Sequence, residues 1–141
     1  MAITFQAENI TFPKIKRQAT KSWIKSVAQN YDKKIGEISY LFCDDEKILE
    51  VNREYLSHDY YTDIITFDYS EDDKISGDII ISLDTVRTNS QKYQVDFMEE
   101  LHRVIIHGIL HLCGLNDKSP EEEKAMREAE NDALNLLKSI S

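Results

Sequence analysis

Three side chains in the last third of the chain have the types and the spacing of a metal site. His107 and His111 are four residues apart, and Asp117 follows six residues later. Histidines at i and i+4 lie on one face of a helix, so both imidazoles can reach a single ion. Gly114 lets the chain leave that helix in a left-handed turn, which can bring Asp117 back as a third ligand. We therefore expect His107, His111 and Asp117 to bind one zinc ion per chain.

The number of ligands indicates what such an ion would do. Three protein ligands leave a fourth position for water, which distinguishes catalytic zinc from structural zinc. The spacing is H-x-x-x-H-x-x-G-x-x-(H or D), as in metzincin proteases, but those enzymes carry a glutamate directly after the first histidine. Gly108 stands there in this chain. The sequence therefore predicts a metal-dependent hydrolase that lacks the general base of an ordinary zinc peptidase.

Several blocks of the sequence, spread over about residues 36–130, form a recognisable series. The blocks are Val51-Asn52-Arg53-Glu54-Tyr55, Asp59 followed by Thr62-Asp63-Ile64-Ile65-Thr66-Phe67, Gly77-Asp78-Ile79-Ile80-Ile81, His107-Gly108-Ile109-Leu110-His111-Leu112-Cys113-Gly114, and the pair Met126 and Glu130. In this order they resemble the blocks of the YbeY family, metal-dependent endoribonucleases that mature ribosomal RNA. The resemblance implies a small α+β domain with a zinc site, cleavage of single-stranded RNA, and a role in ribosome assembly and quality control.

Two positions depart from the family pattern. The family usually has histidine as its third ligand, where this chain has Asp117. A carboxylate is an acceptable zinc ligand, but its negative charge should make the ion a weaker Lewis acid than a third imidazole would. The family commonly has arginine, a bidentate partner for phosphate, at the position of Leu56. Arg53, one turn earlier, is the candidate to replace it, although an exposed helical arginine is more often only solvated.

Further residues could take part in the chemistry. Asp63 and Asp78 match family blocks and could orient a ligand or the substrate, but a turn or capping role fits them equally well. The general base is left unassigned, with Arg53 and Asp63 as candidate contributors to catalysis. A structural role is the commoner one for the rest: His58 in a polar surface loop, His102 on another helical face, Cys113 in the core, and Met126 in helix packing.

The elements that must position these residues follow from hydrophobic periodicity and capping residues. Alternating and β-branched runs predict strands at about 3–10, 36–43, 63–69 and 77–83, with an acidic turn at 70–76. The Ile79-Ile80-Ile81 run indicates burial on both faces of the sheet. Helical spacing predicts helices at about 13–30, 46–55, 84–91, 96–113 and 119–140, with Asp84 and Asp96 as the capping residues of the third and fourth. We expect one α+β domain over residues 1–141, with a mixed sheet of about four strands packed with helices.

The charge is unevenly distributed along the chain. The formal net charge is -9, yet residues 1–40 hold seven basic and three acidic side chains. Most of these basic residues fall on the predicted helix at 13–30, whose apolar face would be Ile15, Ala19, Trp23 and Val27. This asymmetry allows a basic face for a polyanion, although a merely solvated helix face is the commoner case. The expected partners are single-stranded or ribosomal RNA and ribosomal particles.

Composition limits the compartment and the alternative functions. The chain has two cysteines, too few for a disulfide framework, and no apolar stretch of membrane-spanning length. We expect a soluble, cytoplasmic protein without a membrane partner. One alternative to the nuclease is a zinc peptidase of unusual type. Another is a ribosome assembly factor that uses the metal for stability and has no strong nuclease activity.

Overall fold

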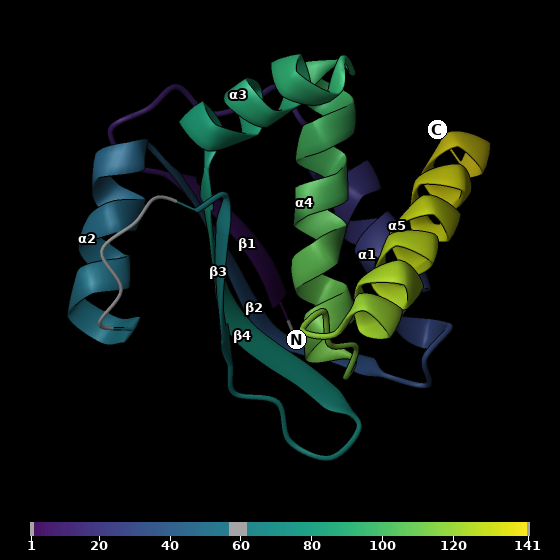
Figure 1. Ribbon diagram of the computed structural model, residues 1–141. Coiled ribbons are helices and arrows are strands. Elements are labelled where there is room, and N and C mark those ends of the chain that lie inside the picture. The colour runs from purple at the N-terminus through teal and green to yellow at the C-terminus, as the bar shows by residue number, and fades with distance from the viewer. Residues whose placement is uncertain (1, 57–61, 141) are drawn as a thin grey trace.

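A four-stranded sheet forms the centre of the fold in the computed structural model, which describes residues 2–56 and 62–140 (Figure 1). The strand order is β1-β2-β4-β3; β1, β2 and β4 are parallel, and β3 is antiparallel to β4. This confirms the expected α+β class and the mixed sheet. The strands are β1 (Ala2–Ala7), β2 (Lys34–Cys43), β3 (Ile64–Asp68) and β4 (Lys74–Ser82).

Helices cover both faces of this sheet (Figure 1). α1, α4 and α5 lie on one face, α2 lies on the other, and α3 packs across the start of α4. No helix in the described ranges is both long and apolar enough to cross a membrane. The helices are α1 (Arg17–Gln29), α2 (Asp45–Leu56), α3 (Leu83–Tyr93), α4 (Phe97–Leu112) and α5 (Pro120–Ile140).

The apolar residues of β4 divide between two cores. Ile79 and Ile81 belong to the large cluster beneath α1, α4 and α5, whereas Ile80 belongs to a smaller cluster beneath α2. Successive side chains of a strand point to opposite faces, so a strand covered on both sides needs a continuous apolar run. The predicted burial of this run on both faces is confirmed.

α4 is fixed against the sheet at two points. The buried Tyr40 hydroxyl donates a hydrogen bond to the Ile105 carbonyl oxygen over 2.8 Å. Gly108 is buried, and a β-carbon built on it would lie 2.9 Å from Cδ1 of Ile79. The absence of a side chain at Gly108 therefore lets α4 approach β4 closely, and this close packing sets the height of α4 above the sheet.

The first helix is shorter than the sequence predicted. It begins at Arg17 and not at Pro13, because the Ile15 N–H bonds to the Pro13 carbonyl over 2.8 Å in a three-residue turn that precedes the helix. Ala19 is exposed, contrary to the expected apolar face. The buried face of α1 is Thr20, Trp23, Ile24, Val27 and Ala28.

The sheet and its capping residues also differ in detail from the prediction. β1 ends at Ala7, and β4 begins at Lys74, so part of the predicted acidic turn is strand. Ser82, and not Asp84, caps α3: its hydroxyl accepts the Thr85 N–H over 3.3 Å. Asp84 lies inside the helix and accepts the Asp45 N–H instead. Asp96 does precede α4 as its N-cap residue, but its side chain makes no capping hydrogen bond.

Candidate metal centre

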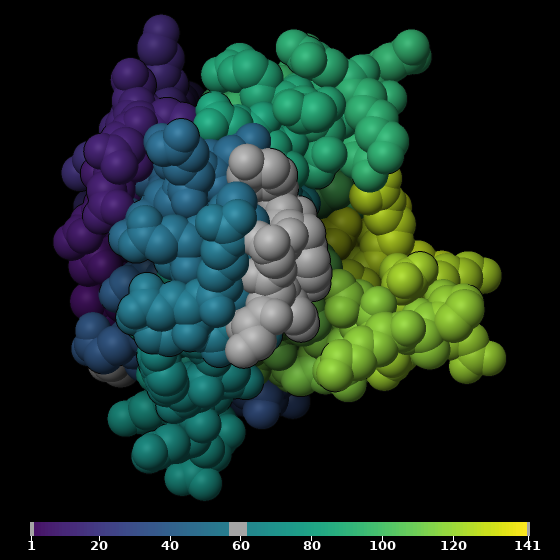
Figure 2. All heavy atoms as spheres, turned by 60° about the vertical axis from the view of Figure 1, so that its left-hand side comes forward, coloured from purple at the N-terminus to yellow at the C-terminus, as the bar shows by residue number. Residues whose placement is uncertain are grey.

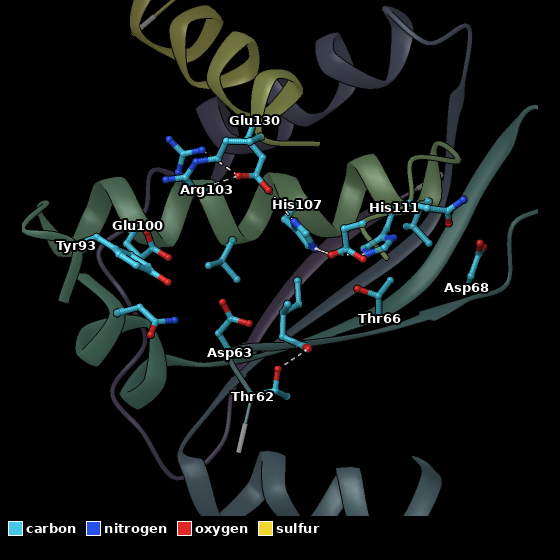
Figure 3. Close-up of a pocket in the computed structure, with 17 residues that line it drawn as sticks. Thr62, Asp63, Thr66, Asp68, Tyr93, Glu100, Arg103, His107, His111 and Glu130 are labelled. Carbon is cyan, nitrogen blue, oxygen red and sulfur yellow. Dashed lines mark hydrogen bonds and ion pairs between the residues drawn. The ribbon is translucent and has the colours of Figure 1, made fainter. Parts of the chain in front are cut away.

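A cleft of about 560 Å³ opens between β3, α3, α4 and the start of α5. In the space-filling view the surface is hollowed between α3 and the segment that leads into α5 (Figure 2). The close-up shows polar side chains from β3, α4 and α5 converging on this cleft (Figure 3). The acidic and basic residues that line it are Asp63, Asp68, Glu100, Arg103, His107, His111, Asp117, Arg127 and Glu130.

The three predicted ligands meet in this cleft. Their ligand atoms all lie within 4.8 Å of one another. Nε2 of His107 is 3.3 Å and Nε2 of His111 is 3.5 Å from the same oxygen of Asp117. Ligand atoms bound at about 2.0–2.2 Å in a tetrahedron are about 3.3–3.6 Å apart, so these distances fit a common ion. His107, His111 and Asp117 could therefore hold a metal ion.

The predicted turn after α4 is present and brings Asp117 back toward the two histidines. α4 ends at Leu112, and Gly114 has a φ of +106°. The N–H of Leu115 bonds to the carbonyl of Leu110, and that of Gly114 bonds to the carbonyl of His111, as in a Schellman motif. A residue with a β-carbon would strain this conformation, so the glycine determines the direction in which the chain leaves the helix.

A buried carboxylate orients the His107 ring from the side opposite Asp117. Oε2 of Glu130 lies 2.7 Å from Nδ1 of His107, and its Oε1 accepts from the Arg103 guanidinium over 2.9 Å. Burial opposes the charge of Glu130, but these two hydrogen bonds hold its pKa below the ordinary value. A carboxylate only accepts, so Nδ1 must carry the proton. The lone pair of Nε2 is then free for a metal.

The same contacts act on the protonation of His107. Burial disfavours its charged form, but the hydrogen bond and the negative charge of Glu130, followed by the charge of Asp117, raise its pKa overall.

The sequence prediction did not include Arg103 in the site, although its spacing from His107 was a signal. Arg103 precedes His107 by four residues, the same spacing that separates the two histidines.

The two candidate contributors to catalysis lie in different places. Asp63 lines the cleft, where burial raises the pKa of its carboxyl and the nearby His107 partly opposes that rise. Arg53 does not line the cleft: it is an exposed residue of α2, on the other face of the sheet, beside Leu49 and Glu50. The structure thus brings only Asp63 of this pair into the cleft that holds His107, His111 and Asp117.

The remaining candidates that the structure describes lie outside the cleft. Asp78 lines a different hollow, on the α2 side of the sheet, together with Val51. His102 packs edge-on against Trp23, and burial lowers its pKa. Cys113 packs against the core, and Met126 is buried, both as predicted. His58 lies outside the described residues.

Comparison with known proteins identifies relatives of the chain. The family model described as endoribonuclease YbeY matches residues 2–138. A Parabacteroides distasonis protein named Endoribonuclease YbeY is 66% identical over 137 residues, covering 97% of this chain and 96% of that protein. A Bacteroides fragilis protein of the same name is 63% identical over 138 residues, covering 98% of this chain and 99% of that protein.

A solved structure supports the fold. The solution structure of a Thermotoga maritima protein matches with a TM-score of 0.66 at 24% identity, covering 98% of this chain and 93% of that one. This match shows the fold. The sequence matches lead to one conclusion: the chain belongs to the YbeY endoribonuclease family.

Proposed function

We propose that this protein is a zinc-dependent endoribonuclease that cleaves single-stranded RNA during ribosomal RNA maturation and ribosome quality control in the cytoplasm. The observation that carries the proposal is the His107, His111 and Asp117 group, which converges at metal-binding distances inside an open cleft. Two relatives named Endoribonuclease YbeY, 66% and 63% identical over nearly the whole chain, support the substrate class.

The donor set suits zinc, since two imidazoles and one carboxylate are ordinary zinc ligands. Bound zinc would activate water and polarise a phosphodiester. The residues around it prepare the ligands. Glu130 holds His107 with Nε2 facing Asp117, and Arg103 holds Glu130 through one hydrogen bond while it bonds Asn131 through another. This chain of contacts fixes the ring before any metal arrives.

Asp63 is the side chain best placed to move a proton. It projects into the cleft from just before β3, facing the α4 residues that line the other wall (Figure 3). Because burial raises its pKa, it keeps a proton to a higher pH than an ordinary aspartate does. A carboxyl group in that state can deliver a proton to the oxygen that leaves when the phosphodiester breaks.

The experiment that tests the proposal measures cleavage of labelled single-stranded RNA, a matched RNA duplex and casein by zinc-loaded protein. We expect cut single strands only, with loss of cutting after chelation, restoration by zinc, and loss in His111→Ala. His102→Gln is the matched control, because His102 is on the same helix but outside the cleft. It should keep the activity.

Two results would contradict this function. Casein cleavage that disappears in His107→Ala, without any RNA cleavage, would show an unusual peptidase. RNA cleavage no greater than that of a blank preparation, combined with a lower melting temperature in His111→Ala, would show a metal-stabilised assembly factor.

A further inference from the structure

The cleft itself offers little attraction for a polyanion. Five carboxylates line it, against two arginines, and both arginines lie near Glu130. The Arg103 guanidinium bonds Glu130 and Asn131 over 2.9 Å each, while Arg127 is 3.8 Å from Glu130. Affinity for RNA comes mainly from neutralisation of phosphates by lysine and arginine. A protein with a net charge of -9 therefore needs basic side chains elsewhere to hold its substrate.

A second hollow has the opposite character. It occupies about 420 Å³ between the later turns of α1 and the first residues of β1 and β2. No acidic side chain is among its described lining residues, which we call the lysine groove: Ile3, Lys21, Ser22, Lys25, Gln29, Lys33, Lys34 and Ile35. Lys34 has an ion pair with Asp73 over 3.7 Å, but both side chains are more than half exposed, so the pair is weak.

The groove and the cleft are separate surfaces. β1 is at one edge of the sheet, and β3, which lines the cleft, is at the other. None of the described residues lines both the groove and the cleft.

We propose that the lysine groove binds the phosphate backbone of single-stranded RNA as a site apart from the cleavage cleft. This inference rests on the proposed function for its substrate class. Four ammonium groups on flexible stems suit a backbone that varies in conformation, since lysine contacts phosphate as a point charge. The serine and glutamine of the groove add uncharged donors, and the isoleucines add an apolar surface.

The test compares two double variants that carry the same charge. Lys21→Gln with Lys25→Gln removes two lysines of the groove, and Lys124→Gln with Lys138→Gln removes two exposed lysines of α5 as the control. Glutamine and lysine have similar helix propensities, so both proteins should melt like the original. Binding of a fluorescent oligouridine is followed by anisotropy in chelator, over a range of salt concentrations.

The groove variant should bind several-fold more weakly. Its slope of log affinity against log salt should be smaller by about 1.4, the contribution of two phosphate contacts on a single strand. The control should keep the original slope. Equal affinities and slopes in the two variants would overturn the assignment. It would also be overturned if polyglutamate bound the groove more tightly than oligouridine, because the partner would then be an acidic protein segment.

Cleavage assays separate this inference from the proposed function. With zinc-loaded protein, the groove variant should show a raised KM and an unchanged kcat, because its lysines do not touch the reacting atoms. Cleavage with equal KM values in both variants would overturn the groove and leave the nuclease intact. RNA that binds through the groove but is never cut would instead overturn the proposed function.

Discussion

Glu130 of α5 lies 2.7 Å from Nδ1 of His107 on α4, and this contact determines which nitrogen of His107 faces the cleft. The two residues are 23 positions apart, so helix packing alone brings them together. We expect Glu130→Gln to lower zinc affinity by about 10- to 100-fold, the usual cost of losing such a partner. Competition with a coloured chelator measures it. Glu128→Gln, on the exposed side of α5, is the control; equal affinities in the two variants would disprove the role of Glu130.

Asp117 supplies the third ligand in the proposed site. Asp117→Asn should remove about one equivalent of zinc from the purified protein, because a neutral amide oxygen is a poorer zinc ligand than a carboxylate. Elemental analysis gives the occupancy. Asp68→Asn changes another carboxylate that lines the cleft and should leave the zinc content unchanged. Full occupancy in Asp117→Asn would remove Asp117 from the ligand set.

Asp117→His tests the departure from the usual family ligand. Three neutral imidazoles leave more positive charge on the ion than two imidazoles and a carboxylate. The variant should therefore keep its zinc and cleave RNA several-fold faster, as single-turnover kinetics would show. A slower variant with full zinc content would indicate that the negative charge of Asp117 assists the reaction.

Gly108 is expected to be intolerant of even a methyl group. Gly108→Ala gains helix propensity but forces a β-carbon against Ile79, and we expect a net loss of about 1 kcal/mol in the free energy of unfolding. Urea denaturation measures the loss. Ile79→Val removes the Cδ1 atom that lies 2.9 Å away, so the double variant should be more stable than the sum of the single changes predicts. Additive effects would show that this contact is not the cause.

His102 should make the stability of the protein depend on pH. Burial lowers its pKa in the folded state, whereas the unfolded chain binds the proton near pH 6.5. Lowering the pH below that value therefore favours unfolding. His102→Phe keeps an aromatic ring against Trp23 and should lose less stability between pH 7 and pH 5. Urea denaturation of both proteins in chelator measures the effect. His107 contributes with the opposite sign, but equally in both proteins, so it drops out of the difference between them. Parallel curves of unfolding free energy against pH would contradict the prediction.

Local patterns were enough to predict that His107, His111 and Asp117 come together. The i, i+4 spacing of His107 and His111 and the glycine three residues later are properties of one helix and its exit, so no long-range information was needed. Glu130 and Arg103 could not be assigned their roles in the same way. Their contact depends on α5 folding back along α4, which no spacing within a single element encodes.

The prediction for Arg53 also failed to foresee a long-range feature, the side of the sheet on which its helix packs. Its sequence neighbours matched the family blocks, but α2 packs on the opposite face of the sheet from α4. Which face a helix covers depends on the connections of the sheet and not on the sequence of the helix. The predicted start of α1 was wrong for a local reason. The turn at Pro13 competes with the first turn of the helix.

The turn at Gly114 has His107 and His111 before it and Asp117 beyond it. An ion held by all three residues would link the two sides of the corner between α4 and α5. Removing the ion would make this corner more mobile without unfolding the sheet. Amide hydrogens around residues 113–120 should then exchange faster in chelator, while those of β2 and β4 stay protected. The availability of metal would thus control the rigidity of the corner as well as the chemistry.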